Sequence, residues 1–294
     1  MNLSDYLAER RREIDAALDR LAPAETTAPE LIHRAMRYSL FAGGKRVRPI
    51  LCLAAGRAVA DKVPGLASVA CSLELAHTYS LIHDDLPALD DDDFRRGLPT
   101  CHKQFGEAMA ILAGDALLTL AFQVLAGAEG VPGARRARLA AELAAAAGTV
   151  EGMVGGQVWD LEGVKQTPTP ELLGRIHRAK TGALLTASVR MGAISAGAGE
   201  GKLEALTCYG RHVGLAFQIV DDLLDVEQPS EALGKTAGKD AQQGKITFPA
   251  VYGLAESHRM AEEEAARARA ALDGFGERAA RLRQIADFIV CRRR

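Results

Sequence analysis

The sequence lacks the features that mark several common classes of protein. Its five cysteines are odd in number and widely spaced, and no CxxC pair predicts a zinc ribbon or a redox motif, which favours reduced thiols. Lys and Arg number 36 against 38 for Asp and Glu, so the formal net charge of -2 leaves no polybasic character suited to nucleic acid or an anionic membrane. The first residues are amphipathic rather than basic and then apolar, so we predict no secretory signal and a cytoplasmic location.

Alternating Val, Ile and Thr, the pattern of β-strands, is also hard to find, whereas Ala and Leu recur at helical spacing throughout. Gly and Pro gather at short breaks that divide the chain into about ten helices with no long linker. With 294 residues and a hydrophobic content of 48%, the chain is long enough for one large core. We therefore predict an all-α helical bundle in a single domain over residues 1–294.

One apolar run, residues 108–128, is long enough to span a bilayer. Asp115 lies near its middle, where a carboxylate costs about 2.5–3.5 kcal/mol on insertion scales. Apolar helices of this kind are common in the cores of large all-helical proteins. We therefore expect a buried core helix here and no membrane span.

Two acidic clusters each follow a long apolar segment. The first is SLIHDDLPALDDDDFRR, with six aspartates in residues 84–93, and the second is GLAFQIVDDLLD, which ends at Asp225. Asp221 and Asp225 are four residues apart, so a helix places both on one face, with Gln218 one turn earlier. Pro87 stops a straight helix in the first cluster, so we expect Asp84 and Asp85 on a last helical turn and Asp90 returning from the loop.

These clusters are interpreted either as solvated acidic turns or as metal sites. The EF-hand spacing of calcium sites is absent from both. Magnesium takes one or two carboxylates, keeps several waters and leaves positions for phosphate oxygens. Two such clusters together are suited to hold several Mg²⁺ ions on one diphosphate.

A diphosphate site also needs cations, and the chain offers them outside the two clusters. They occur in GGKRVRP, directly after the first cluster and in later turns: Lys45, Arg46, Arg48, Arg95, Arg96, Lys180, Lys235 and Lys245. Arginine binds phosphate through two parallel hydrogen bonds, and lysine acts as a point charge. The GKT at residues 234–236 is not a P-loop, because Pro229 stands where the pattern requires Gly.

His77 lies seven residues before Asp84 on the same helical face, where its imidazole can donate to a phosphate or simply be a satisfied core histidine. Together with Glu74 it forms an ExxH pair, which raises a carboxylate di-iron bundle as a rival. Such a site needs two ExxH motifs and two further glutamates, and we find only this one.

At this point the sequence resembles the trans-isoprenyl diphosphate synthases, most closely the bacterial-type farnesyl diphosphate synthases. The resemblance covers residues 31–289, nearly the whole chain. Eight blocks in the family's order carry it: GGKRVRP, HTYSLIHDDLPALDDDDFRRGLPTCH, AGDALL, GGQVWD, KTGAL, GLAFQIVDDLLD, GKTAGKD and GKITFP.

The resemblance implies the isoprenoid synthase fold, with helices around a central cavity, two aspartate motifs that face one another across its mouth, and a homodimer. It assigns the magnesium ligands as Asp84, Asp85, Asp90, Asp221, Asp222 and Asp225. It assigns the allylic diphosphate to Arg95, Lys180, Thr181, Gln218 and Lys235. It assigns isopentenyl diphosphate to Lys45, Arg48, His77 and Arg96. Three Mg²⁺ ions are implied, with Mn²⁺ as a substitute.

The implied reaction needs fixed positive charge on a departing diphosphate, which Mg²⁺, Arg95, Lys180 and Lys235 would supply. The allylic cation needs dipoles without a nucleophile, and the Thr181 hydroxyl and Gln218 amide are candidates. C4 of isopentenyl diphosphate then attacks C1 of the cation. We expect the catalytic residues to be Asp84, Asp85, Lys180, Thr181, Gln218 and Asp221.

Product length depends on the helix that precedes Asp84, because the growing tail runs along it. Tyr79 is a candidate floor for the tail, and Ser80 leaves room that an aromatic side chain would fill. In the family this Tyr-Ser pair, with the longer first motif, resembles synthases that stop at C15. We therefore predict farnesyl diphosphate, made from dimethylallyl diphosphate through geranyl diphosphate, with C10 or C20 products as alternatives.

Two rivals share the resemblance. A terpene cyclase pairs the first motif with an Asn/Ser/Glu metal motif, but the only asparagine here is Asn2. A non-catalytic partner subunit of a heteromeric synthase usually has degraded aspartate motifs, and both are intact here. We further expect residues 234–245, rich in Gly and Lys, to form a lid on diphosphate binding, and the terminal CRRR to fray or fold over the substrate.

Overall fold

A computed structural model describes residues 2–227 and 244–291. The described residues form two compact units. One is drawn from Met1–Ile50 and Pro64–Ala140, and the other from Leu51–Val63 and Ala141–Arg294. The single domain over residues 1–294 stays a prediction, and each unit is described by itself below.

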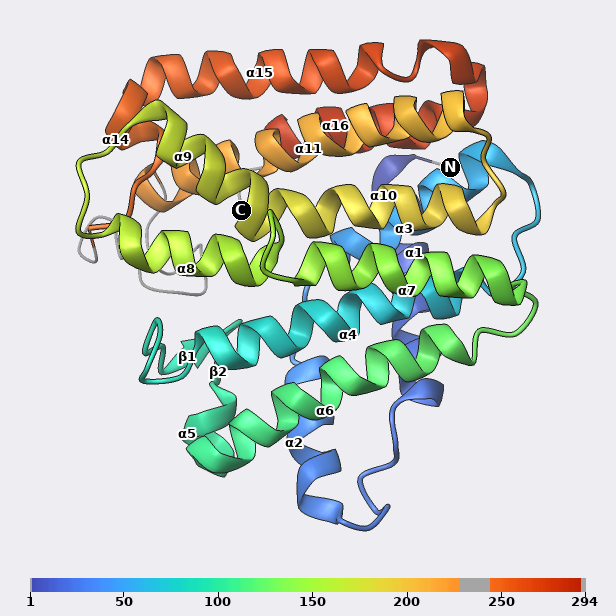
Figure 1. Ribbon diagram of the computed structural model, residues 1–294, viewed down its shortest axis with the longest axis vertical. Helices are drawn as coiled ribbons and strands as arrows, with labels where there is room; N and C mark the ends of the chain where they lie inside the picture. Colours follow the sequence, from blue (N-terminus) through green and yellow to red (C-terminus); the bar gives the residue numbers. More distant parts are fainter. Residues whose placement is uncertain (1, 228–243, 292–294) are drawn as a thin grey trace. The chain divides into compact units, whose positions relative to one another are not determined.

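The described chain is helical almost throughout, which confirms the predicted all-α class (Figure 1). The helices of the first unit are α1 (Leu3–Leu21), α2 (Glu30–Leu40), α4 (Leu66–Asp84), α5 (Cys101–Phe105) and α6 (Glu107–Ala126). Two helices have residues in both units: α3 (Val47–Val59) and α7 (Gly133–Ala147). The described helices outnumber the expected ten, because short segments such as α5 form helices of their own.

The second unit has two kinds of helix. Its α-helices are α8 (Met153–Gly163), α9 (Pro170–His177), α10 (Ala183–Ser195), α11 (Glu200–Glu227), α14 (Phe248–Tyr252), α15 (Leu254–Ala270) and α16 (Ala280–Cys291). A π-helix, η1 (Arg178–Gly182), joins α9 to α10, and a 3₁₀-helix, η2 (Asp273–Ala279), leads into α16. Short π-helical turns occur frequently at functional sites.

The core of the first unit forms around α4, which is apolar on nearly every side and therefore buried. It packs along α6 and also contacts α1 and α2. Gly114 of α6 makes this packing close, because a Cβ there would lie 2.1 Å from Nε2 of His83 on α4. The last turn of α4, which carries the first aspartates, is thereby fixed against α6.

By length and composition, α6 is the one helix of the described residues that could cross a membrane. In the structure 44% of its apolar window is buried, against α2, α4 and α5. The helix is therefore buried along one face only, less than the fully buried core helix that we expected.

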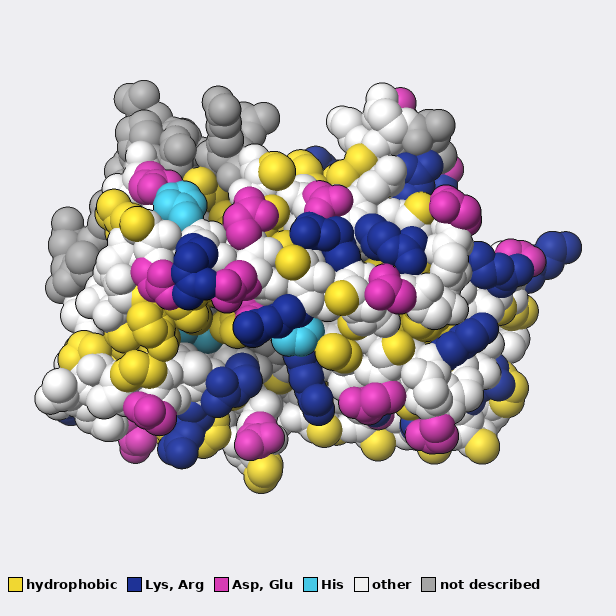
Figure 2. Space-filling view, turned by 90° about the horizontal axis from the view of Figure 1, so that it is seen from above, with side chains coloured by type: hydrophobic (Ala, Val, Ile, Leu, Met, Phe, Trp, Pro, Cys, Tyr) yellow, Lys and Arg dark blue, Asp and Glu magenta, His cyan; other side chains and the backbone are white. Residues whose placement is uncertain are grey.

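The core of the second unit forms around α11, which packs against α10, α15 and α16. Ile219, Leu223 and Leu224 of α11 are buried together with Leu173 and Ile176 of α9. Burial of apolar surface stabilises such packing by about 25 cal/mol per Å². This packing holds the end of α11, and therefore its aspartates, in place. The outer face of α15 is charged instead, and Figure 2 shows acidic and basic side chains interspersed on the side of the molecule that carries it.

A small hairpin is the exception to the helical fold. The strands β1 (Phe94–Arg95) and β2 (Leu98–Pro99) pair antiparallel directly after the first acidic cluster. Arg96 and Gly97 both have positive φ, which is the backbone of a tight two-residue hairpin turn. The sequence did not reveal these strands, because two residues are too few to show an alternating pattern.

Candidate active site

The first aspartate motif folds as its sequence predicts. Helix α4 ends at Asp84, and Asp85 is its C-cap. The chain then turns back through Pro87, so that the N–H of Asp90 donates to the carbonyl of Asp84 over 2.8 Å. This turn brings the backbones of Asp84 and Asp90 together at the end of the helix, and both side chains are partly exposed.

Asp85 is held differently from its neighbours. It is buried, and both carboxylate oxygens accept from Arg95, with Nε 2.7 and 2.8 Å from Oδ1 and Oδ2. Burial raises the pKa of Asp85, and Arg95 opposes this shift, while Asp92 and Asp90 add to it. The pair fixes the guanidinium of Arg95 beside the first motif.

The GGKRVRP segment contacts the hairpin that carries Arg96. Nη1 of Arg96 donates to the carbonyl of Gly43, and its guanidinium lies against Gly44. Gly44 has a φ of +122°, a backbone conformation that L side chains rarely adopt, and this favours glycine here. The structure thus brings together two of the cationic segments that the sequence predicts for isopentenyl diphosphate.

His77 lies among the same cations. Burial lowers the pKa of His77 well below its usual range, and the charges of Arg48, Arg96 and Arg95 lower it further. The imidazole is therefore neutral at pH 7. Lys45, also predicted for this group, is exposed at the surface.

Arg46 behaves differently from the other cations of its segment. It is buried, with Nη1 2.7 Å from Glu74 and Nε 2.8 Å from Asp15. Its backbone φ is positive, at 52°. Glu74, half of the ExxH pair, is thereby paired with an arginine rather than placed as an iron ligand.

Lys180 lies in the π-helix η1, and its Nζ is 2.6 Å from Oδ2 of Asp160 on α8. The two helices approach closely at Gly156, where a Cβ would lie 2.1 Å from the backbone nitrogen of Lys180. Thr181, the next residue, is partly exposed. The sequence placed Lys180 in the site but missed Asp160, which precedes it by 20 residues.

The second motif lies on the last turns of α11, as the spacing predicts. Asp225 is buried and Asp221 is partly exposed. Both oxygens of Asp222 are engaged by protein groups: Nε2 of Gln218 donates to Oδ1 over 2.8 Å, and the N–H of Phe248 donates to Oδ2 over 3.0 Å. His177, which the sequence analysis missed, places Nε2 3.3 Å from Oδ2 of Asp222.

Tyr79 and Ser80 lie on α4 where the sequence places them. The Tyr79 side chain is buried, and its ring meets His83 edge to face at 5.7 Å between centroids. Burial raises the pKa of Tyr79, and the charge of Asp84 adds to this. Ser80 is partly exposed, and its hydroxyl donates to the carbonyl of His77.

These carboxylates fit a hard divalent cation. Asp84 and Asp90 meet at one helix end, and Asp221 and Asp225 share one face of α11, so each unit offers oxygen ligands of the kind that Mg²⁺ prefers. Asp85 and Asp222 also accept hydrogen bonds that position Arg95 and Gln218, and their role as Mg²⁺ ligands stays a prediction. That the two motifs face one another stays a prediction.

The family model described as "Polyprenyl synthetase" matches residues 29–286. The chain belongs to the polyprenyl synthetase family. Membership agrees with the resemblance seen in the sequence and makes the protein a trans-prenyltransferase.

Among named polyprenyl synthetases, a dimethylallyltranstransferase of Fischerella ambigua is 48% identical over 99% of this chain and 84% of its own length. A chloroplastic geranylgeranyl pyrophosphate synthase of Arabidopsis thaliana is 46% identical over 99% of this chain and 82% of its own. The crystal structure of an FPP/GFPP synthase from Zymomonas mobilis superposes with a TM-score of 0.86 and 36% identity, covering 98% of this chain and 99% of that one. Prenyl chain transfer is therefore common to the relatives, whereas their product lengths differ.

Part of the predicted polyprenyl synthetase site falls outside the described residues. Lys235 and most of the proposed lid at residues 234–245 lie there, as do the terminal arginines 292–294. Lys245 is described and partly buried. A cavity of about 720 Å³ in the second unit is lined by residues such as Arg178, Arg190 and Arg211, and by none of the predicted substrate residues.

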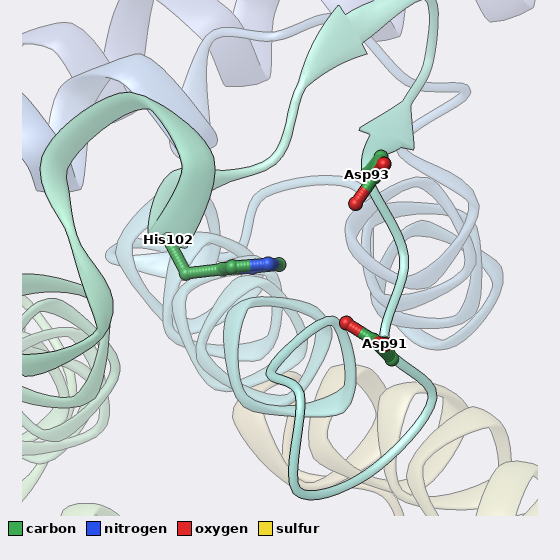
Figure 3. Close-up of side chains that lie close together, drawn as sticks. All are labelled: Asp91, Asp93 and His102. Carbon is green, nitrogen blue, oxygen red and sulfur yellow. The ribbon is translucent and has the colours of Figure 1, made fainter.

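The sequence analysis also missed a group of possible metal ligands after the first motif. One ligand atom each of Asp91, Asp93 and His102 lies within 4.8 Å of the other two, and Figure 3 shows the three side chains directed toward a common space. Within residues 2–227 and 244–291, no other three Asp, Glu, His or Cys side chains bring their ligand atoms this close together. The signal in the sequence was the histidine of TCH, nine residues beyond the last aspartate of the cluster.

Proposed function

We propose that this protein makes (2E,6E)-farnesyl diphosphate by condensing isopentenyl diphosphate with dimethylallyl diphosphate and then with geranyl diphosphate, in the cytoplasm. The observation that carries the chemistry is the pairing of each aspartate motif with positioned polar groups. Arg95 is fixed on Asp85, and Gln218 is fixed on Asp222, in a chain that belongs to a prenyltransferase family.

In this proposal the aspartates of the two motifs would hold three Mg²⁺ ions at each active site: Asp84, Asp85 and Asp90 from the first motif, and Asp221, Asp222 and Asp225 from the second. Mg²⁺ held there would neutralise the charge that develops on the leaving diphosphate. Arg95 and Lys180 stabilise the same oxygens through fixed positive charge. Their carboxylate partners hold them in place before the substrate arrives.

The orientation of Gln218 matters for the allylic cation. The carboxylate of Asp222 can only accept hydrogen bonds, so the Gln218 amide must direct its NH₂ group toward Asp222. Its carbonyl oxygen is then the end left to face a developing positive charge. Gln218 thus offers a dipole of the right sign, together with the hydroxyl of Thr181.

The neutral imidazole of His77 fits the second substrate. It can donate one hydrogen bond to the diphosphate of isopentenyl diphosphate. Being neutral, it adds no further positive charge to that of the nearby Arg48 and Arg96. The two arginines supply charge and bidentate geometry. This substrate keeps its diphosphate during the reaction, so its site must bind the group without activating it.

The C15 product is proposed from Tyr79 alone. The names of the relatives do not decide product length, since they include geranylgeranyl synthases and an FPP/GFPP synthase. A buried tyrosine on the helix that leads to Asp84 is a physical floor for a growing apolar tail. C20 is the alternative if the tail passes Tyr79.

Products of the purified chain, separated by mass spectrometry, test this proposal. Wild type should give C15, Tyr79→Ala should extend the products toward C20, and Ser80→Phe should shorten them toward C10. Tyr6→Ala is the matched control, because Tyr6 and Tyr79 are equally buried, at 7% exposure. Unchanged C15 products from both variants at positions 79 and 80 would show that the floor lies elsewhere.

A further inference from the structure

Asp91, Asp93 and His102 are not among the residues assigned to substrate above. They belong to the loop after the first motif and to the first turn of α5, and they come together around the hairpin of β1 and β2. Asp91 and Asp93 are exposed, whereas His102 is buried, with 6% of its surface exposed (Figure 3). A carboxylate pair alone would be an ordinary solvated turn, so the state of the histidine decides what this group can do.

The hydrogen bonds around Thr100 fix the tautomer of His102. The Thr100 hydroxyl lies 2.8 Å from the carbonyl oxygen of Asp92, and that oxygen can only accept. Its single proton is therefore donated there, and Oγ1 must accept from Nδ1 of His102, 3.1 Å away. In the neutral ring the proton is on Nδ1, so Nε2 has the lone pair.

Nε2 of His102 is buried and has no hydrogen-bond partner. A buried polar atom without a partner has lost its hydrogen bonds to water and gained none in return, so such an atom calls for an explanation. Figure 3 shows the ring directed toward Asp91 and Asp93. A histidine that donates through one nitrogen to a fixed acceptor and offers the other to nearby carboxylates has the arrangement of a metal ligand.

We propose that Asp91, Asp93 and His102 bind one divalent transition-metal ion of the Zn²⁺ class, separate from the Mg²⁺ of the two motifs. Imidazole with carboxylates suits Zn²⁺ and related ions, whereas Mg²⁺ prefers oxygen ligands. Zn²⁺ bonds of about 2.0–2.2 Å require the ligand atoms to approach more closely than 4.8 Å. The two exposed carboxylates can do so by side-chain rotation, with water as a fourth ligand.

The bound ion would link the loop after the first motif to α5, two segments that are separated in the sequence by the hairpin. Asp91 follows Asp90 directly, and Asp93 precedes the strand that contains Arg95, while His102 belongs to α5. An ion here would fix the loop of the first motif to α5. Lys103, whose Nζ is 2.7 Å from Oδ1 of Asp93, competes for one of the ligands.

The test is a calorimetric titration of the full chain, stripped with a chelator, with Zn²⁺ in excess Mg²⁺ so that the aspartate motifs are already occupied. Wild type should bind one equivalent of Zn²⁺ that Mg²⁺ does not displace, and Zn²⁺ should raise the melting temperature. His102→Gln should lose that equivalent and the shift. Asp92→Asn and His258→Gln are matched controls outside the group and should keep both.

Asp93→Asn and Asp91→Asn keep the test decisive if His102→Gln does not fold. Both positions are exposed, and asparagine tolerates the positive φ of 49° at residue 91. Each should weaken Zn²⁺ binding, and Lys103→Gln should strengthen it by removing the competing ammonium. Equal Zn²⁺ binding by wild type and the Asp93→Asn variant, or displacement of Zn²⁺ by Mg²⁺, would overturn the proposal.

Discussion

His77 shows how one residue takes its charge state from its surroundings. Its usual pKa is about 6.5, and in the folded protein burial and four arginines hold the pKa of His77 well below that value. Below pH about 6.5 the unfolded chain therefore binds a proton that the folded chain does not. The contribution of this residue to stability is complete above that pH and is lost as the pH falls toward the lowered pKa.

We expect the free energy of unfolding of wild type to fall from pH 7.5 to pH 5.5 more steeply than that of His77→Gln. One such proton changes the slope by at most about 1.4 kcal/mol per pH unit. Urea unfolding followed by circular dichroism at the two pH values measures the difference. Parallel slopes for the two proteins would mean that His77 titrates normally in the folded chain.

Arg46 has a structural role that its neighbours in GGKRVRP do not share. It is 2% exposed at its side chain, as is its partner Glu74. Replacing Arg46 by Met would leave Glu74 buried without its charged partner, which costs about 3–5 kcal/mol. In urea unfolding the double variant Arg46→Met, Glu74→Leu should recover much of that loss. Arg259→Met, at an exposed ion pair with Glu256, is the control and should change the free energy of unfolding little. If Arg46→Met lost no more stability than this control, Arg46 would have no structural role.

At the scale of the elements, the contact between α8 and η1 positions Lys180. Gly156→Ala would place a Cβ 2.1 Å from the Lys180 backbone, so one of the two helices must move. We expect a destabilisation of about 1–3 kcal/mol and a lower kcat, because the ammonium of Lys180 shifts with its helix. Thermal unfolding and steady-state rates measure both effects.

Gly201→Ala, on α11, is the matched control for this substitution. Nothing lies within 4 Å of the Cβ that it would add, so the variant should be neutral or more stable by up to about 1 kcal/mol. If Gly156→Ala behaved like Gly201→Ala, the close approach of α8 and η1 would not position Lys180.

The elements also show where sequence reasoning succeeds and where it stops. Pro87 and the helical spacing at the second motif fix local geometry, so the end of α4, the return of Asp90 and the shared face of Asp221 and Asp225 could be predicted. The pairing of Lys180 with Asp160 could not, because it depends on a π-helix and a close helix contact at Gly156. Nor could the burial of Arg46, because its partners Asp15 and Glu74 are distant from it in sequence.

On the scale of the whole molecule, we propose that the protein is a homodimer. Ile111 and Leu112 of α6 are exposed to water in the single chain. They lie on a helix that is apolar along most of its length. A second copy would remove such residues from water. Light scattering should give about twice 31.2 kDa, and Leu112→Glu should lower that mass. A mass of 31.2 kDa for wild type would exclude the dimer.

The central claim is that this chain by itself performs magnesium-dependent prenyl transfer. The most direct measurement is the product of the purified protein incubated with dimethylallyl and isopentenyl diphosphates, with Mg²⁺ and with a chelator. We predict a C15 diphosphate that forms with Mg²⁺ and disappears with the chelator. No prenyl product from the folded protein in Mg²⁺ would contradict the claim and favour a partner subunit that does not act alone.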